Sequence, residues 1–180
     1  DMHKYGFAPK NVSVVLYRDR ALRAFQIFTC MRTTTYALVN PTVLSARSGG
    51  PLAGAWAALH HLGEEGYRRL IRDTMDAARR LVAGIDAIEG LRVLGRPDMC
   101  LFSFAAEGLN VFELADALRD RGWFAQPQFS TPLSPANLHI TVNPAGAAHA
   151  EAFLVDLRDA VDAVRNGAEP IDAAAVRDTV

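Results

Sequence analysis

The chain is organised around residues 1–10, Asp-Met-His-Lys-Tyr-Gly-Phe-Ala-Pro-Lys. They contain Lys4 and Lys10, the two lysines of the sequence, whereas every other basic side chain among the 19 lysines and arginines is an arginine. A lysine can attack a carbonyl as a neutral amine and form a Schiff base, but an arginine stays protonated. His3 places a titratable ring beside Lys4. On the residues alone, a nucleophilic Lys4 and an ordinary surface lysine are equally acceptable interpretations.

The composition describes a globular chain with no electrostatic or membrane signature. Of its 180 residues 50% are hydrophobic, and the net charge is −1. This charge balance argues against a nucleic-acid partner, and no apolar run reaches the roughly 18 residues that span a bilayer. Cys30 and Cys100 follow no metal-ligand spacing, which favours two buried thiols in a reducing compartment over a disulfide or a metal site. We therefore expect a soluble, cytoplasmic protein without a metal.

An apolar run after the first ten residues indicates a strand inside a parallel sheet. Residues 11–17 are apolar almost throughout, as in a strand that is buried on both faces. Such a strand needs neighbours, and the rest of the chain offers few, so we expect the other strands of this sheet to lie upstream. A short helix over 21–28, a polar loop over 30–36 and a break at 40–42 are predicted next.

A small-residue stretch precedes the following helix. Ser45-Ala46-Arg47-Ser48-Gly49-Gly50 leads into a helix predicted over 52–62. Backbone N–H groups at such a helix start can bind an anion, but the same pattern is also an ordinary helix start.

Gly63 and Gly66 are predicted to interrupt regular structure, and from residue 67 onward helices and short strands alternate. Asn110 and Glu113 have the spacing of a capping box, and Gly122 is a typical helix end. The predicted helices cover 67–88, 110–122 and 147–165, and the predicted strands cover 91–94, 100–104, 123–128 and 138–142. This order predicts an α+β layer in which helices cover a small sheet.

Residues 1–10, followed by 14–19, resemble the cofactor-lysine segment of the group II pyridoxal-phosphate-dependent decarboxylases. They are most similar to the sphingosine-1-phosphate lyase-like branch, whose pattern reads Asp-x-His-Lys-Tyr-Gly and then Ala-Pro-Lys. Further matches in register extend the resemblance to about residue 165; they are Pro41-Thr42, Arg47, Gly49-Gly50, Trp56-Ala57-Ala58-Leu59, Gly63-Glu64, Gly66-Tyr67 and Gly122-Trp123.

The resemblance implies an α/β fold, the C-terminal part of the type I (aspartate aminotransferase-like) fold. Residues 1–66 would form the end of the large, parallel-sheet cofactor domain. Residues 67–167 would form the small C-terminal α+β domain, and residues 168–180 a tail.

The resemblance also implies a site for pyridoxal 5′-phosphate, bound as a Schiff base to Lys4, with His3 at the cofactor phosphate. The cofactor-binding residues that it implies are Asp1, His3, Lys4, Ser45 and Arg47. The implied catalytic residues are Lys4 and Lys10, and the implied substrate-binding residues are Lys10 and His139.

The implied reaction is a retro-aldol cleavage of an amine substrate, a phosphorylated sphingoid base, to an aldehyde and phosphoethanolamine. The enzyme would be a homodimer with shared active sites, and this fragment alone would be inactive. Two alternatives remain: an amino-acid decarboxylase, and a catalytically inactive homologue that acts in dimerisation or binding. Ala46 stands where the family has a hydroxyl side chain, and residues 33–46 depart from the lyase pattern, which affects the substrate assignment more than the cofactor.

Overall fold

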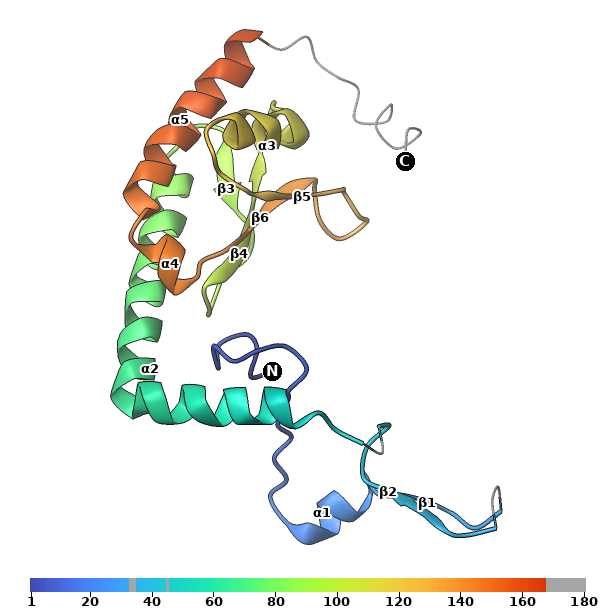
Figure 1. Ribbon diagram of the computed structural model, residues 1–180. Helices are drawn as coiled ribbons and strands as arrows, with labels where there is room; N and C mark the ends of the chain where they lie inside the picture. The colour runs from blue at the N-terminus through green and yellow to red at the C-terminus, as the bar shows by residue number, and fades with distance from the viewer. Residues whose placement is uncertain (33–34, 45, 168–180) are drawn as a thin grey trace. The chain divides into compact units, whose positions relative to one another are not determined.

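The computed structural model describes residues 1–32, 35–44 and 46–167, which divide into two compact units (Figure 1). Unit 1 runs from Asp1 to Tyr67, and unit 2 begins at Arg68. The predictions made for residues 33, 34 and 45 and for the tail from residue 168 concern positions outside the described part of the chain.

Unit 1 contains a short helix, a hairpin and the beginning of a long helix. These are α1 (Arg20–Ala24), β1 (Phe28–Cys30) paired antiparallel with β2 (Leu38–Asn40), and the first part of α2 (Gly49–Asp86). The side chain of Asp19 caps α1 by accepting a hydrogen bond from the backbone N–H of Leu22 at 2.9 Å. The sequence did not predict β1 and β2, because strands of three residues are too short to show an alternating pattern.

The prediction of a buried strand over residues 11–17 is wrong for this structure. These residues form no strand; Val12 is buried, but Val14, Val15 and Leu16 are 58%, 62% and 88% exposed. A strand of this kind is stabilised by hydrogen-bonded neighbours on both sides. No strand in the described ranges pairs with this run, so its apolar side chains face solvent.

Helix α2 spans both units and is interrupted at Gly63. Its 38 residues include the helix predicted over 52–62 and most of the helix predicted over 67–88, which ends two residues earlier than expected. Gly63 has φ 57° and ψ −176°, outside the helical range. The prediction that Gly63 interrupts regular structure is confirmed, whereas Gly66, also predicted as an interruption, is helical.

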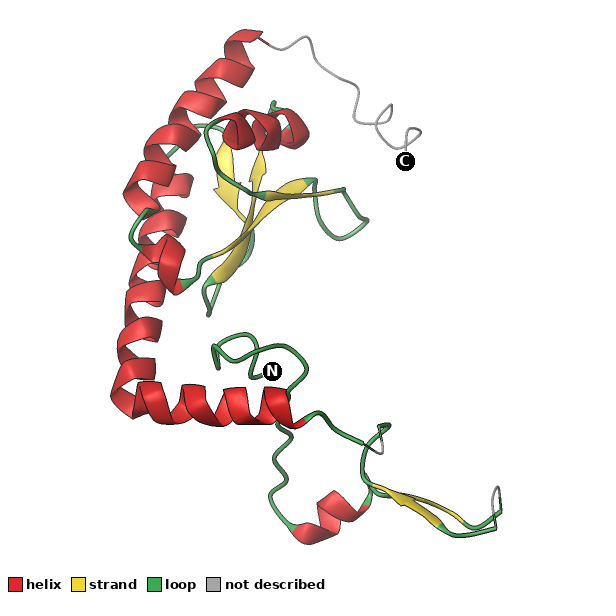
Figure 2. Ribbon diagram, viewed as in Figure 1, coloured by secondary structure: helices red, strands yellow, loops and turns green. Residues whose placement is uncertain are grey.

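Unit 2 is built on an antiparallel sheet with the strand order β3-β4-β6-β5 (Figure 2). Its strands are β3 (Leu91–Val93), β4 (Leu101–Ala106), β5 (Gln126–Gln128) and β6 (Asn137–Thr141). Its helices are the second part of α2, α3 (Val111–Asp120), α4 (Pro144–Ala147) and α5 (Ala150–Gly167). The predicted α+β arrangement of helices and a small sheet is confirmed.

The core of unit 2 lies between this sheet and its helices. Phe104 and Leu138 face each other on β4 and β6, and both are fully buried. Because side chains alternate along a strand, their neighbours Ser103 and His139 point to the opposite face of the sheet.

The helices α2 and α5 pack closely against each other in this unit. A Cβ placed on Gly84 of α2 would overlap Leu154 Cδ1 of α5. Arg80 and Glu151 form an ion pair between the same two helices at 3.3 Å.

Two predicted elements of unit 2 are shorter than expected. The strand predicted over 123–128 contains only β5, because the backbone N–H of Trp123 donates instead to the carbonyl of Leu118 at the end of α3. The helix predicted over 147–165 begins later, at Ala150, because Ala147 belongs to the separate short helix α4, whose start is capped by Asn143.

The cap predicted at Asn110 is confirmed and can be tested. Its side-chain oxygen accepts a hydrogen bond from Phe112 N at 2.9 Å. We expect Asn110→Ala to lower the free energy of unfolding by about 1 kcal/mol, because the first turn of α3 loses this acceptor. Urea unfolding measures the change. Asn110→Asp keeps an acceptor and should retain most of the stability; equal midpoints for Asn110→Ala and the unchanged protein would show that the cap contributes nothing.

Candidate functional site

Backbone hydrogen bonds fold the segment around Lys4 into a series of turns, which we name the Lys4 turn (residues 1–12). Lys4 N donates to the carbonyl of Asp1 at 3.2 Å, and Phe7 N donates to the carbonyl of Lys4 at 3.1 Å. Ala8 N donates to the carbonyl of Met2 at 2.9 Å, while Met2 N donates to that of Val12 at 3.2 Å. The segment is therefore ordered without being helix or strand.

Asp1, His3 and Lys4, all predicted site residues, gather in one cluster of side chains. Lys4 Nζ lies 2.9 Å from Asp1 Oδ2. His3 Nε2 lies 3.9 Å from the same oxygen. Ser13, which the sequence did not single out, donates its hydroxyl proton to Asp1 Oδ1 at 2.5 Å. The Asp1 carboxylate thus holds this cluster together.

The ring of His3 has one nitrogen that is not satisfied by the protein. Nδ1 is buried and has no hydrogen-bond partner among the described residues, although the side chain as a whole is 27% exposed. A buried polar atom without a partner costs free energy. The residue next to Lys4 therefore carries a nitrogen whose hydrogen-bonding capacity the described residues leave unused.

The backbone of the Lys4 turn is tight and strained. A Cβ on Gly6 would lie 2.6 Å from the carbonyl oxygen of Met2, so only glycine fits there. Phe7 and Asn11 have positive φ values of 50° and 73°. Asparagine tolerates such values, whereas a bulky residue such as phenylalanine rarely does. Strain of this kind concentrates at functional sites.

The other predicted site residues lie apart from this cluster. Lys10 belongs to the same turn and is exposed. Arg47 is exposed and donates to the hydroxyl of Thr42 at 2.7 Å, so it anchors its own loop. Ser45 lies outside the described residues, and His139 belongs to unit 2.

His139 is part of a polar row on the open face of the sheet in unit 2. Its Nδ1 lies 3.4 Å from Ser103 Oγ on β4, and its Nε2 lies 3.2 Å from Thr141 Oγ1 on β6. Gln126 is its partner on β5. The alternation of β6 indicated the face on which His139 lies. Ser103 became recognisable as its neighbour only when the pairing of β4 with β6 was known.

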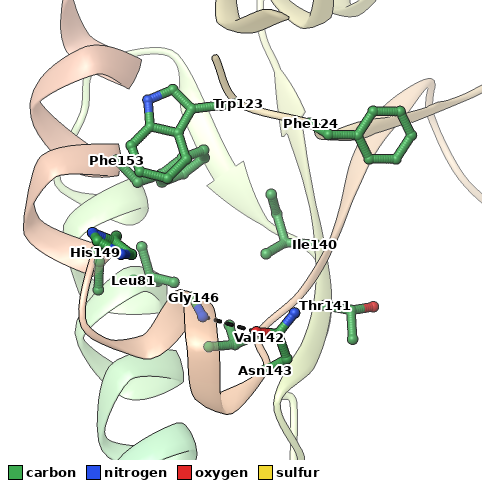
Figure 3. A pocket seen from close by; sticks show the side chains of 11 residues that line it. Leu81, Trp123, Phe124, Ile140, Thr141, Val142, Asn143, Gly146, His149 and Phe153 are labelled. Atoms are coloured by element: carbon green, nitrogen blue, oxygen red, sulfur yellow. Dashed lines mark hydrogen bonds between the residues drawn. The ribbon is translucent and has the colours of Figure 1, made fainter. Parts of the chain in front are cut away.

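Unit 2 also contains a pocket that none of the predicted site residues line (Figure 3). It has a volume of about 230 Å³ and mainly apolar walls, among them Trp123 and Phe153, whose rings meet edge to face at 5.4 Å. The indole N–H of Trp123 donates to Asp156 at 2.6 Å. Ile140 and Thr141 line the pocket, but the residue before them on the same strand, His139, does not.

Two kinds of feature are absent from the part of the chain that the structure describes. Its acidic, histidine and cysteine side chains form no group of three or more that could hold a metal ion. None of its helices has the length and apolar character needed to cross a bilayer.

The tightness of the Lys4 turn can be tested at Gly6. We expect Gly6→Ala to lower the free energy of unfolding by about 1–3 kcal/mol, because the added methyl group overlaps the backbone of Met2. Urea unfolding of the chain measures the loss. Gly49→Ala is the matched control, since a Cβ there meets nothing within 4 Å. Equal stability of the two variants would contradict the described turn.

Comparison with known proteins places the chain in a family. No protein-family model matches it. A sphingosine-1-phosphate lyase of Oryza sativa subsp. japonica is 37% identical over 171 residues, which are 95% of this chain. The chain spans 31% of the length of that relative.

Solved structures show the same likeness in three dimensions. A sphingosine-1-phosphate lyase of Burkholderia pseudomallei matches with a TM-score of 0.82 and 32% identity, over 99% of this chain and 39% of that chain. A glutamate decarboxylase of Lactobacillus brevis matches with a TM-score of 0.76 over 94% of this chain and 40% of that chain; at 20% identity this match concerns the fold alone.

The resemblance carried by residues 1–10 and the predicted fold class are thereby confirmed. The chain belongs to the group II pyridoxal-phosphate-dependent decarboxylase family, in its sphingosine-1-phosphate lyase-like branch, and corresponds to the C-terminal part of that family's type I fold.

Proposed function

We propose that the protein containing this chain is a pyridoxal-phosphate-dependent carbon–carbon lyase that cleaves a phosphorylated sphingoid base to an aldehyde and phosphoethanolamine. The observation that carries the proposal is the Lys4 cluster. It places a primary amine, a carboxylate and an unsatisfied histidine nitrogen together. The chain in which they occur is 37% identical to a sphingosine-1-phosphate lyase.

The residues of the Lys4 cluster fit the cofactor. Lys4 supplies the amine that a carbonyl group requires. His3 Nδ1, which has no partner among the described residues, would hydrogen-bond to a phosphate oxygen or to the phenolic oxygen of the cofactor. When bound, pyridoxal phosphate supplies an aldehyde and a pyridinium ring that takes up the electron pair released when a bond at the amine-bearing carbon breaks.

Asp1 would orient the amine of Lys4. Its Oδ2 lies 2.9 Å from Lys4 Nζ, so the carboxylate fixes the position of the amine within the segment. The hydrogen bond from Ser13 to the other oxygen holds the carboxylate in place. Lys4 is 64% exposed in this chain, which leaves room for a bound group at its amine.

The remaining predicted residues would act on phosphate groups and on the substrate. Lys10, exposed and near Lys4 in sequence, would bind the substrate and assist proton transfer. Arg47, which precedes α2, would contribute to cofactor binding, and Ser45, outside the described residues, is proposed for the same role. His139, supported by Ser103 on the open face of the sheet, would bind the substrate.

The proposal extends to the whole protein. Residues 1–66 would be the end of the large cofactor domain, and residues 67–167 the small C-terminal domain. The protein would be a cytoplasmic homodimer whose two subunits share their active sites. The exposed apolar side chains of unit 1 support the proposal that residues 1–66 belong to a larger domain of a dimer, since the rest of that domain or a second subunit would cover them.

The assignment of Lys4 can be tested by chemical trapping. We expect the full-length protein to absorb visible light with pyridoxal phosphate, and borohydride to attach the cofactor irreversibly to Lys4, as read by peptide mass spectrometry. Lys4→Ala should abolish both signals. Lys10→Ala, the matched control, should keep the trapping but lower turnover by about a hundredfold, the usual scale for a lost proton-transfer group. Trapping that persists in Lys4→Ala would contradict the assignment of Lys4 as the cofactor-binding lysine.

The products distinguish the proposed lyase from its alternatives. We expect the full-length protein to release an aldehyde and phosphoethanolamine in equal amounts from a phosphorylated sphingoid base. Mass spectrometry detects both products. Release of carbon dioxide from an amino acid would indicate a decarboxylase instead. Trapping at Lys4 with neither reaction would indicate an inactive homologue.

A further inference from the structure

Helix α2 consists of two helical segments, residues 49–62 and residues 64–86, joined at Gly63. The φ of 57° and ψ of −176° at Gly63 belong to a backbone region that is essentially restricted to glycine. A Cβ at this position would meet nothing within 4 Å. Glycine is therefore needed here because of its backbone dihedral angles, and not because a side chain would collide with neighbouring atoms.

The Lys4 turn contacts α2 on both sides of this interruption. On the first segment, a Cβ on Gly54 would lie 2.7 Å from Pro9 Cγ, which shows how closely the turn approaches. On the second segment, the Tyr67 hydroxyl donates a partly buried hydrogen bond of 2.7 Å to the carbonyl of Gly6. The turn thus bridges the two segments of the helix.

Tyr67 also supports the strained residue next to Gly6. The rings of Phe7 and Tyr67 are stacked, with centroids 6.0 Å apart and planes 15° apart. Phe7 has a φ of 50°, which is costly for a bulky side chain unless its surroundings hold it. Its backbone N–H donates to the carbonyl of Lys4 at 3.1 Å. The contacts of Tyr67 are therefore connected to the backbone of Lys4 through Phe7.

We propose that Tyr67 is a positioning residue for Lys4. By holding Gly6 and Phe7, it sets the direction in which the Lys4 side chain leaves the backbone. Because Tyr67 belongs to the second segment of α2, which continues into unit 2, this direction also depends on that segment. The inference rests on the proposed function, because the direction of Lys4 affects chemistry only if its amine reacts with the cofactor.

The variant Tyr67→Phe tests this role in the full-length protein. It removes the hydroxyl that donates to Gly6 and keeps the ring that stacks on Phe7. Pyridoxal phosphate is added to the cofactor-free protein, and borohydride-trapped cofactor at Lys4 is quantified over time. We expect the initial trapping rate to fall about fivefold, the factor typical of one lost hydrogen bond. Tyr17→Phe, the same chemical change elsewhere in unit 1, should trap at the unchanged rate.

Two further readouts separate positioning from a general loss of stability. In Tyr67→Phe, kcat should fall while KM stays the same, and the visible circular dichroism of the bound cofactor should weaken. If the role of Tyr67 were purely structural, the variant would have a lower urea midpoint. Its folded fraction would keep the kcat and the visible circular dichroism of the unchanged protein. If Tyr67→Phe does not fold, Phe7→Leu replaces it, since this variant removes the ring contact and keeps the Tyr67 hydroxyl; the same reduced trapping rate is expected.

The outcomes are distinguishable. If the unchanged protein traps cofactor at Lys4 and Tyr67→Phe traps it equally fast with the same dichroism, the positioning role is overturned and the proposed function stands. If the unchanged protein traps nothing at Lys4, the proposed function fails and the positioning role fails with it.

Discussion

The packing of the Lys4 turn against α2 is the contact on which the candidate site depends. Residues 1–12 form neither helix nor strand, so no regular element orients Lys4. The close approach of Pro9 to Gly54 and the hydrogen bond from Tyr67 to Gly6 provide that orientation instead. Since the same helix continues into unit 2, one element both contacts the Lys4 turn and forms part of unit 2.

The two units differ in how completely they bury their apolar side chains. Unit 2 has a core with fully buried side chains on strands and helices, such as Phe104 and Leu157. Unit 1 leaves many large apolar side chains exposed, among them Val14, Val15, Leu16, Phe25, Phe28 and Trp56. Because the chain spans 31% of the length of a curated relative, this difference agrees with the proposed assignment of unit 1 to a larger domain.

Prediction from sequence succeeded where the signal is local. The periodicity of residues 67–88, the cap at Asn110 and the interruption at Gly63 each depend on neighbouring residues, and each is present in the structure. The buried strand predicted over 11–17 failed, because an apolar run becomes a strand only when other strands pair with it. The hairpin of β1 and β2 was missed because its strands are too short for a pattern.

The sequence by itself determined the family and the type of most elements in unit 2, because both depend on residue types and short spacings along the chain. Only the tertiary structure decided which residues surround Lys4 and hold it. Ser13 reaches Asp1 across a turn, Ser103 meets His139 across two strands, and Tyr67 bonds to Gly6 from 61 positions away. Such contacts depend on how distant segments pack, and no local pattern of side chains encodes that packing.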